Sequence, residues 1–533
     1  MLKHTSTPTT IQYILSNHPD GLGARLGAMI IGIFLAKILK VPFKFTWRNS
    51  VDIECINKYS DYQRDENGTI LWAGINNNAV ENVFSQDFIK NYLWDGEEIE
   101  PDYGFALTAK KRNIKQLKST QEAKGILWQS TSRLPDEWLL DYGSQSKILQ
   151  ELAECYKTIG FSQDYLNIIN ATQNIAKQFP NGFIAIHIRA GDLAYSEVRY
   201  YPSVFIEKFF PIAIAIDIIK NTDKKTAIVI FSDDINSSKH LTEYCHSQGY
   251  KNVHNIDSLV TENYATAQRA FFEINLMANA LKIYTSSNSQ FSKVASMISG
   301  CNNIIFFQQK YNNTELYHAL KKNIETLELP KLQMAMSFYF LYRIATELDL
   351  STTKKISYLQ KAHAYDPKNL AYPIYMIETY LASNNIQDAE AIISGLIREN
   401  LPLFISTLFS WNGRAYQQQR DFFLQQAYRL KDRAPNLCLL VSLISYDKKM
   451  QHNLLIYFYH LLKNNPQIPN NKTEIILASL NYCNSQKVFA NEISQELNEL
   501  TKKPYLAFRF LSRLFRSCYR AILRWNFRRM LKI

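Results

Sequence analysis

The sequence predicts an α/β protein in which two lobes, each built on a parallel sheet, precede a helical domain. Between residues 182 and 308, short apolar strands alternate with helical stretches, a pattern typical of a parallel sheet covered on both faces. Before residue 48, a strand, a glycine loop, an apolar helix and a second strand follow one another. After about residue 330 the strand pattern stops and only helical periodicity continues.

The composition fits a folded chain in a reducing compartment. The 533 residues, 46% of them hydrophobic, allow three domains of ordinary size. The seven cysteines are scattered singly, so they predict neither a zinc site nor a disulfide framework. The first residues lack the pattern of a signal peptide, and the longest apolar run, residues 28–39, is too short to span a bilayer.

The net charge of +12 is concentrated at the C-terminal end. Residues 504–533 contain seven Arg, one Lys and no acidic residue, so they carry +8 and the other residues share +4. That balance argues against a nucleic-acid-binding body. One helical face of this tail carries Arg509, Arg513, Arg516, Arg520 and Arg524, and the opposite face is apolar. We expect a basic amphipathic helix on an anionic membrane surface, and hence a cytoplasmic protein that is peripheral on the inner face of the membrane. The alternative is a final helix that closes the helical domain.

The N-terminal lobe, residues 1–175, opens with a predicted βαβ unit. Its strands are residues 10–15 and 41–47, and an apolar helix between them ends near Leu39. In the loop before that helix, Gly21 and Gly23 permit backbone angles closed to other residues and let a phosphate or sugar approach the main chain. The alternative is a tight turn without a ligand.

The second lobe, residues 176–325, is predicted to be Rossmann-like. Its strands are residues 183–189, 226–234, 252–257, 282–287 and 302–308. Arg189 ends the first of them, where a guanidinium points into the ligand crevice and can hold phosphate oxygens. The alternative is that His187 and Arg189 cap the strand, with Asp192 as the ion-pair partner.

Two further strand ends carry polar residues. Ser232 and Asp233 end the second strand, where they can reach ribose or sugar hydroxyls. The alternative, which can hold at the same time, is that Ser232 or Asp233 caps the next helix. Ser287, Asn288 and Ser289 lie between a strand and an apolar-periodic helix, so free backbone N–H groups and the positive helix end face that loop. A diphosphate is stabilised there without a metal, and the chain has no Asp-x-Asp triplet to hold one.

Residues 330–500 are predicted to form a helical domain that offers a docking surface for a protein partner. Two stretches, residues 358–369 and 423–436, each place a small Ala between larger residues and end in a Pro-containing turn. This is typical of a tetratricopeptide-like repeat, with a generic helical bundle as the alternative.

Four segments, residues 21–50, 187–197, 231–234 and 271–298, resemble the fucosyltransferase superfamily, in particular bacterial nodulation α1,6-fucosyltransferases and animal core fucosyltransferases. The resemblance covers about residues 10–310. It implies a GT-B-like pair of Rossmann-type lobes. The activity that it implies is an inverting, metal-independent transfer of fucose or a related sugar from a GDP-sugar donor to a glycan or lipid-linked glycan acceptor, in bacterial surface-glycan synthesis.

The resemblance also implies roles for single residues. Arg189, in a His-x-Arg segment that begins at His187, would bind the β-phosphate of GDP, and Glu197, eight residues later, would deprotonate the acceptor hydroxyl. Ser289 and Gln290 match the family's Ser-Ser-Gln segment, whose first Ser is Asn288 here. Glu273, seventeen residues before Gln290, would accept the two N–H donors of the guanine edge. Without the resemblance, Glu273 is an ordinary surface charge beside an apolar helical stripe.

One position departs from the family pattern. The family's second Arg is Ala190 here, and Arg199 is the candidate substitute for its charge. The loss favours a second hypothesis, a non-catalytic glycan- or partner-binding protein on a degenerate transferase fold. A third hypothesis keeps the enzyme and changes the donor to GDP-mannose or a GDP-heptose, because no residue identified above recognises the sugar.

Overall fold

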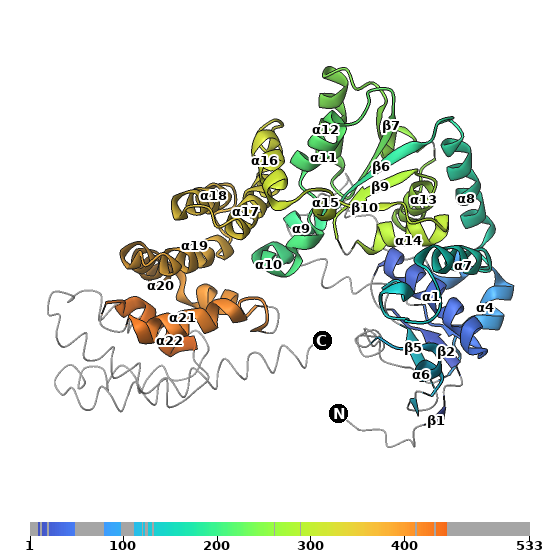
Figure 1. Cartoon of the computed structure of the whole chain (residues 1–533), viewed down its shortest axis with the longest axis horizontal. Helices are drawn as coiled ribbons and strands as arrows, with labels where there is room; N and C mark the ends of the chain where they lie inside the picture. The colour runs from blue at the N-terminus through green and yellow to red at the C-terminus, as the bar shows by residue number, and fades with distance from the viewer. Residues whose placement is uncertain are drawn as a thin grey trace. The chain divides into compact units, whose positions relative to one another are not determined.

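The computed structural model describes residues 9–10, 13–18, 21–47, 79–96, 111–119, 121–122, 126–129, 133–260, 262–287, 289–410, 413–430 and 433–444. The chain divides into two compact units (Figure 1). Unit 1 contains residues 1–198 and 205–334, and unit 2 contains residues 199–204 and 335–533. The predicted tail at residues 504–533 and the C-terminal end of the predicted helical domain lie outside the described residues.

Unit 1 contains a parallel sheet of five strands, in the order β10-β9-β6-β7-β8. The strands are β6 (Phe183–Ile188), β7 (Ala227–Ser232), β8 (Val253–Asn255), β9 (Lys282–Thr285) and β10 (Ile304–Phe306). The central strand β6 is almost entirely apolar and buried, as expected for a parallel strand that is covered on both faces. The predicted α/β class with parallel sheets is therefore confirmed.

Helices cover both faces of this sheet (Figure 1). One face carries α11 (Ile212–Lys220) and α12 (Ile235–Ser247), and α16 (Asn313–Asn323) packs on α11. On the other side are α8 (Gln163–Ala176), α13 (Thr266–Met277) and α14 (Gln290–Ser299). Phe271 of α13 packs edge-on against Tyr165 of α8, with ring centroids 4.8 Å apart. Shorter elements complete this part: α9 (Gly191–Tyr195), η3 (Glu197–Tyr200), α10 (Pro202–Phe205), η4 (Ile206–Lys208), η5 (Ile256–Ser258) and α15 (Phe307–Lys310).

The N-terminal part of unit 1 contains the predicted βαβ unit. Strand β2 (Tyr13–Ser16) pairs in parallel with β3 (Phe43–Phe45), and α1 (Leu22–Leu39) connects them. The third strand, β5 (Ile126–Gln129), pairs in parallel with β2 on its other side and has no counterpart in the sequence analysis. The remaining described elements are β1 (Thr9–Thr10) paired with β4 (Gln121–Glu122), α3 (Val80–Val83), α4 (Gln86–Tyr92), α6 (Ile114–Lys118), η2 (Pro135–Glu137) and α7 (Gln145–Lys157).

Helix α1 is a core helix of unit 1. It packs against α7, α13, α14 and β2, and Leu26, Ile30 and Phe34 are fully buried. Its 18 residues, with a mean hydropathy of 1.9, are long and apolar enough to cross a membrane, so length alone does not exclude a span as the run at 28–39 suggested. Its burial within unit 1 accounts for its apolar composition instead.

The described part of unit 2 is helical from within α17 (Lys331–Glu347) onward, as predicted. The following helices are α18 (Thr352–Tyr365), α19 (Ala371–Ala382), α20 (Ile386–Leu408), α21 (Gln417–Arg429) and α22 (Pro435–Ile444). The small residues Ala362 and Ala427 of the two similar stretches are fully buried. The helices range from 10 to 23 residues, and the tetratricopeptide-like repeat stays a prediction.

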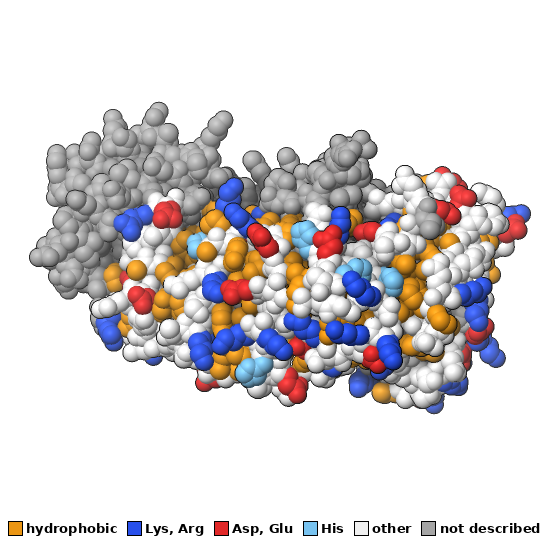
Figure 2. Space-filling model, turned by 90° about the horizontal axis from the view of Figure 1, so that it is seen from above, with side chains coloured by type: hydrophobic (Ala, Val, Ile, Leu, Met, Phe, Trp, Pro, Cys, Tyr) orange, Lys and Arg blue, Asp and Glu red, His pale blue; other side chains and the backbone are white. Residues whose placement is uncertain are grey.

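The described surface carries both signs of charge. On the face drawn in Figure 2, Lys and Arg side chains are interspersed with Asp and Glu. This agrees with the small net charge calculated for the residues before the tail.

Candidate functional site

The strand order places one crevice in the five-stranded sheet. The chain runs from β6 outward through β7 and β8, then returns to the other side of β6 for β9 and β10. Parallel sheets bind ligands outside the carboxyl ends of the two strands at which this order reverses, here β6 and β9. His187 and Arg189 lie at the end of β6, and Ser286, Ser287 and Ser289 follow β9.

Two helices begin beside these strand ends. Helix α14 begins at Gln290 with Ser289 as its N-cap, and α1 begins at Leu22 with Gly21 as its N-cap. The two N-terminal turns are in contact, because a Cβ atom on Gly23 would lie 3.3 Å from the Cα of Phe291. The structure therefore brings together the predicted residues Gly21, Gly23, His187, Ser289 and Gln290. Each helix start presents the positive end of its dipole, and in α14 the Ser289 hydroxyl accepts from the Ser292 N–H at 3.5 Å.

The backbone angles of Gly21 and Gly23 differ from those that we expected. Gly21 has extended backbone angles (φ −63°, ψ 173°), and Gly23 lies inside α1 and is not among the glycines with positive φ. Both conformations are open to other residues, so the expectation of special backbone angles is wrong. What requires a glycine at position 23 is the close approach of α14, since a side chain there would press on the Phe291 backbone.

His187 is a buried, neutral link between β6 and α14. Its Nδ1 lies 2.6 Å from the Ser292 hydroxyl and 3.3 Å from the Ser289 hydroxyl. Its ring lies against Phe291, with centroids 5.2 Å apart. Burial, followed by the nearby Arg189 charge, lowers the His187 pKa to about 3. The imidazole thus adds no positive charge at neutral pH, and it holds the first turn of α14 against the end of β6.

Arg189 and Asp192 form an ion pair at the mouth of the crevice. Arg189 Nη2 donates to Asp192 Oδ2 at 2.6 Å, and Nε lies 3.2 Å from both carboxylate oxygens. The Arg189 side chain is 26% exposed and the Asp192 side chain 7%. Burial alone would raise the Asp192 pKa, but Arg189 holds it below its usual value. The predicted strand-capping pair therefore exists, on a guanidinium that is still accessible to solvent.

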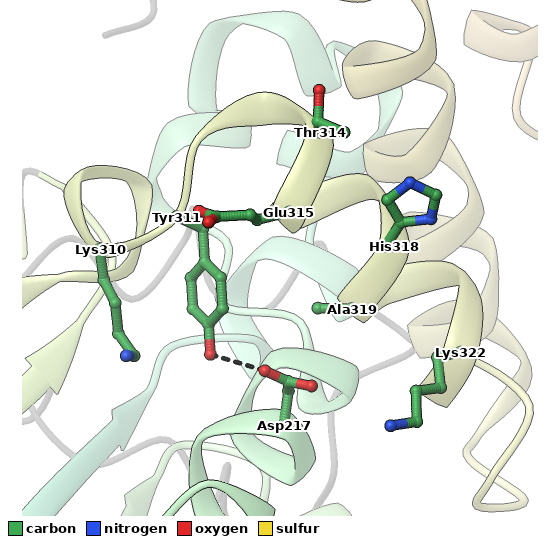
Figure 3. A pocket seen from close by; sticks show the side chains of 8 residues that line it. All are labelled: Asp217, Lys310, Tyr311, Thr314, Glu315, His318, Ala319 and Lys322. Carbon is green, nitrogen blue, oxygen red and sulfur yellow. Dashed lines mark hydrogen bonds between the residues drawn. The ribbon is translucent and has the colours of Figure 1, made fainter.

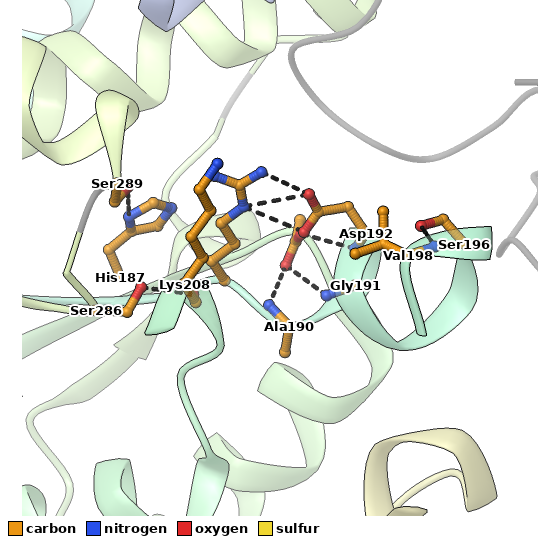
Figure 4. A network of polar contacts seen from close by, with 11 residues as sticks. His187, Ala190, Gly191, Asp192, Ser196, Val198, Lys208, Ser286 and Ser289 are labelled. Atoms are coloured by element: carbon orange, nitrogen blue, oxygen red, sulfur yellow. Dashed lines mark hydrogen bonds and ion pairs between the residues drawn. The ribbon is translucent and has the colours of Figure 1, made fainter. Parts of the chain in front are cut away.

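The turn of Ala190, Gly191 and Asp192, which Figure 4 labels, is bound by Asp233. The Asp233 carboxylate accepts from the backbone N–H groups of Ala190 and Gly191, both at 2.9 Å, and of Asp192 at 3.1 Å. Burial and the neighbouring Asp192 charge raise the Asp233 pKa to about 7. The N-cap of α12 is Asp234, so the predicted alternative of Asp233 or Ser232 as the cap is wrong.

Gly191 is a residue of this turn that the sequence analysis missed. A Cβ atom there would lie 2.8 Å from the carbonyl oxygen of Asp233, so the turn requires glycine for this close approach. The Gly in the segment 187–197 was the signal that could have revealed it.

Ala190, which stands where the resemblance places a second Arg, has no solvent-exposed surface. Arg199 belongs to unit 2, where its Nε lies 3.3 Å from Asp366 Oδ2. With only 7% of its side chain exposed, Arg199 is committed to that pair, so the structure does not support it as the substitute. Lys208 of η4 is the nearby cation instead, because its charge helps to lower the Asp192 pKa.

Hydrogen bonds from the end of β9 hold Lys208 in place. The Ser286 hydroxyl donates to the Lys208 carbonyl at 2.6 Å, and the Ser287 hydroxyl donates to the Glu207 carbonyl at 3.0 Å. Gln308 Nε2 donates to the same Glu207 carbonyl at 2.9 Å. Ser287, one of the loop residues predicted to face a ligand, thus also joins η4 to the crevice, together with Ser286. Lys208 was missed because its place depends on these tertiary contacts.

Glu273 is buried and paired, which excludes the alternative of an ordinary surface charge. It is 6% exposed, and Arg269 Nε donates to its Oε1 at 2.7 Å. Arg269 Nη2 donates in turn to Asp257 Oδ1 at 2.6 Å, in η5 after β8. Burial raises the Glu273 pKa despite the arginine. Glu273 is thus a buried carboxylate linked through Arg269 to Asp257 of η5, and its recognition of a guanine edge stays a prediction.

Two predicted residues are only partly described. Glu197 begins η3, directly after the buried Ser196, but its side chain lies outside the described part of the structure. Asn288 also lies outside the described residues.

Two buried cations near the two helix starts, one in α1 and one in α14, were missed by the sequence analysis. Arg25, in the first turns of α1, is 3% exposed and lies over the Trp47 ring at 5.3 Å. Lys293, in α14, pairs with Glu137 of η2 at 3.5 Å. Both follow the helix starts described above, so each adds positive charge to that side of unit 1.

A separate surface pocket of about 460 Å³ lies on α11, α15 and α16 (Figure 3). It is lined by Asp217, Lys310, Tyr311, Thr314, Glu315, His318, Ala319 and Lys322. The Tyr311 hydroxyl donates to Asp217 Oδ2 at 2.9 Å. None of the predicted site residues lines this pocket. Over the described ranges, no group of three or more His, Cys, Asp or Glu side chains is arranged to hold a metal ion.

No protein-family model and no curated protein matches this chain. Among solved structures, it is similar to fucosyltransferase NodZ from Bradyrhizobium, with 14% identity and a TM-score of 0.32 over 54% of this chain and 92% of that chain. It is also similar to POFUT1 in complex with GDP (10% identity, TM-score 0.29, 57% of this chain and 100% of that chain). A third similar structure is Arabidopsis thaliana FUT1 in complex with GDP (11% identity, TM-score 0.33, 56% of this chain and 70% of that chain). At these identities and TM-scores, the similarities assign neither a family nor a ligand to this chain.

Proposed function

We propose that the chain is an inverting, metal-independent glycosyltransferase that moves fucose or a related sugar from a GDP-sugar to a glycan acceptor. The observation that carries this proposal is the meeting of two helix N-termini, those of α1 and α14, at the strand-order reversal beside Arg189. A diphosphate needs cations and oriented N–H donors around it, and the helix starts with Arg189 and Lys208 are such groups.

The transfer would proceed in one displacement. Glu197 takes the proton of the acceptor hydroxyl, and the oxygen attacks the anomeric carbon of the donor sugar. The bond between that carbon and the diphosphate oxygen breaks, and GDP leaves with the bonding electrons. Arg189 and the two helix starts stabilise the negative charge that develops on the diphosphate. The neutral His187 keeps α14 in place for this task.

A nucleotide panel tests the donor class. Thermal unfolding of the full chain is measured with GDP, ADP, UDP and GDP-fucose at equal concentrations. A ligand at 100 times its Kd stabilises the folded state by about 2.7 kcal/mol, so GDP and GDP-fucose are expected to raise the Tm most. Equal shifts for all four compounds, or none for GDP, would contradict a guanine-nucleotide donor.

The second hypothesis, a non-catalytic binding protein, is favoured by one observation. Carboxylates already occupy two of the anion-binding groups, since Asp192 pairs with Arg189 and Asp233 accepts from three N–H groups of the 190–192 turn. The two hypotheses are separated by a hydrolysis assay without acceptor. The transferase is expected to convert GDP-fucose slowly to free fucose and GDP, with water in place of the acceptor. Binding of GDP-fucose with no release of GDP would favour the non-catalytic protein.

We further propose that the basic tail, residues 504–533, holds the protein on the inner face of the cytoplasmic membrane. Salt should weaken binding of the full chain to anionic vesicles, because it screens the arginines. Removal of the tail should abolish that binding and leave GDP binding intact. A loss of GDP binding on removal would instead identify the tail as a structural helix.

A further inference from the structure

A short segment of the chain, directly after Glu197 and Val198, belongs to unit 2 and not to unit 1. After Val198 the chain leaves unit 1, contributes residues 199–204 to unit 2, and returns to unit 1 at Phe205. Glu197, the proposed base, lies two residues before Arg199. We call residues 199–204 the inserted segment.

Unit 2 holds the inserted segment by its main chain and by a buried ion pair. Asn369 Nδ2 donates to the Arg199 carbonyl at 2.9 Å, and the Tyr416 hydroxyl donates to the Tyr200 carbonyl. Arg199 Nε lies 3.3 Å from Asp366 Oδ2, and both side chains are less than a tenth exposed. Asn369 and Tyr416 are fully buried. These contacts come from the turn after α18 and from the start of α21, which lie far apart in the sequence.

The surface that holds the inserted segment is rich in tyrosine. The rings of Tyr339, Tyr372, Tyr375 and Tyr416 lie in one buried cluster, with neighbouring centroids 5.2–6.1 Å apart. Tyr416 is a member of this cluster. Asn369 lies in the turn before α19, the helix that carries Tyr372 and Tyr375. This aromatic packing keeps the Tyr416 hydroxyl, which donates to the inserted segment, in one position.

On the other side of Glu197 the chain is anchored in unit 1. The Tyr195 hydroxyl donates to the fully buried Asp234 at 3.0 Å, and Ser196 is 2% exposed. The Ser196 hydroxyl accepts from the Val198 N–H at 3.2 Å. Glu197 therefore stands between an anchor at Tyr195 and an anchor at Arg199. With only about 3.3–3.6 Å of chain per residue, each anchor limits how far the backbone of Glu197 can lie from it.

We propose that unit 2 is a positioning device for the reaction, in which Asp366, Asn369 and Tyr416 hold the inserted segment and thereby set the position of Glu197. The inference rests on the proposed function, because it assigns unit 2 a task in that reaction. It differs from the docking role predicted from sequence, since the partner of this surface is a segment of the same chain. Asp366, Asn369 and Tyr416 are positioning residues and touch no substrate.

The test compares two buried carboxylates of unit 2 in the full-length protein. Asp366→Ala removes the ion pair with Arg199. The matched control is Glu390→Ala, because Glu390 accepts from the N–H groups of Asn436 and Leu437, both at 2.8 Å, and does not touch the inserted segment. Turnover of GDP-fucose and the Kd for GDP are measured for each variant. A small displacement of a catalytic group costs about 10²-fold in rate, so Asp366→Ala should lower turnover by that order and leave the Kd for GDP within twofold.

Tyr416→Phe is a milder second variant that keeps the ring and removes only the hydroxyl. It is expected to lower turnover less than Asp366→Ala does, again without a change in GDP affinity, and it covers the case in which Asp366→Ala does not fold. Wild-type turnover in both variants, or an equal loss in Glu390→Ala, would overturn the positioning role.

Amide hydrogen exchange separates this inference from the proposed function. Exchange over residues 197–204 should accelerate in Asp366→Ala and not in Glu390→Ala. If the wild type consumes no GDP-sugar, the proposed function fails, and faster exchange confined to those residues still supports the hold on the inserted segment. Unchanged exchange would overturn that hold whatever the enzymatic result.

Discussion

Unit 1 and unit 2 each contain an arginine–aspartate pair, and the two arginines are ten residues apart in the sequence. The pairs have the same chemistry but differ in sequence separation and in burial. Arg189 and Asp192 are three residues apart, lie at the mouth of the crevice, and leave the guanidinium 26% exposed. Arg199 and Asp366 are brought together from distant parts of the chain and are both nearly closed to solvent. The first pair can exchange its carboxylate for an incoming anion, whereas the second has no such access to solvent.

The energetics of the two pairs follow from their burial. An ion pair that water reaches contributes less to stability than a fully buried one, because water screens it, and the Arg189 side chain is 26% exposed although Asp192 is buried. Removal of one partner of a buried pair costs about 3–5 kcal/mol, because a charge is left unpaired in the interior. The Arg189 pair is therefore suited to binding and the Arg199 pair to structure.

The largest effect is expected between the two pairs, at Glu197. If it is the general base, Glu197→Gln should lower turnover about 10²–10⁴-fold and leave GDP affinity near that of the wild type. Steady-state kinetics and GDP titration measure the two quantities separately. Retained turnover with altered affinity would move the base to a neighbour such as Asp192.

Next in size is the stability of the buried pair. Arg199→Ala should lower the free energy of unfolding of unit 2 by about 3–5 kcal/mol. Arg189→Ala, the matched change in the partly exposed pair, should lower the stability of unit 1 less than Arg199→Ala lowers that of unit 2, because water reaches the Arg189 side chain and partly compensates for the loss of this partner of Asp192. Denaturant unfolding of both variants gives the comparison, and equal losses would remove the distinction between the pairs.

For nucleotide binding the order of the two arginines should reverse. Arg189→Ala should weaken GDP binding by about 1.5–3 kcal/mol, the usual cost of a lost hydrogen bond to a charged group, and abolish transfer. The exposed Arg398 on α20 is a control, and Arg398→Ala should leave GDP affinity unchanged. Wild-type GDP affinity in Arg189→Ala would disprove the donor-site assignment.

The contrast also depends on a neutral His187 beside Arg189. The folded-state pKa of His187 is lowered to about 3, so only the unfolded state takes up this proton between about pH 6.5 and 3. This group should therefore make unit 1 about 2 kcal/mol less stable at pH 5 than at pH 7. Asp233, with its raised pKa, acts in the opposite direction between about pH 4 and 7. Urea unfolding of the wild type and His187→Asn isolates the contribution of His187, and identical pH dependence in both would contradict it.

The smallest effect is expected at a third charged pair, Arg269 and Glu273. Glu273→Gln should reduce the preference for GDP over ADP and UDP by about 1 kcal/mol, because one charged acceptor is lost. Asp257→Asn is the control, since it changes the other partner of Arg269 and keeps the Glu273 carboxylate. An unchanged preference in Glu273→Gln would show that guanine is recognised by other groups.

The local elements and their type were predictable from the order of the amino acids. The apolar strands β6 and β7, the helix α1 and the helical unit 2 were predictable, because the periodicity of apolar residues depends only on which faces are buried. Arg189 at the end of β6 and Ser289 at the start of α14 were predictable for a similar reason, since strand ends and helix starts have characteristic residues.

Only the tertiary structure decided how those elements meet. The contact between Gly23 and Phe291, the place of Lys208 beside Asp192, and the assignment of Arg199 to unit 2 all join residues that no local pattern connects. Sequence proximity suggested Arg199 as a donor-binding cation, but its partner Asp366 lies 167 residues further along the chain. Such pairings are selected by packing and by the cost of burying an unpaired charge, and both depend on the whole fold.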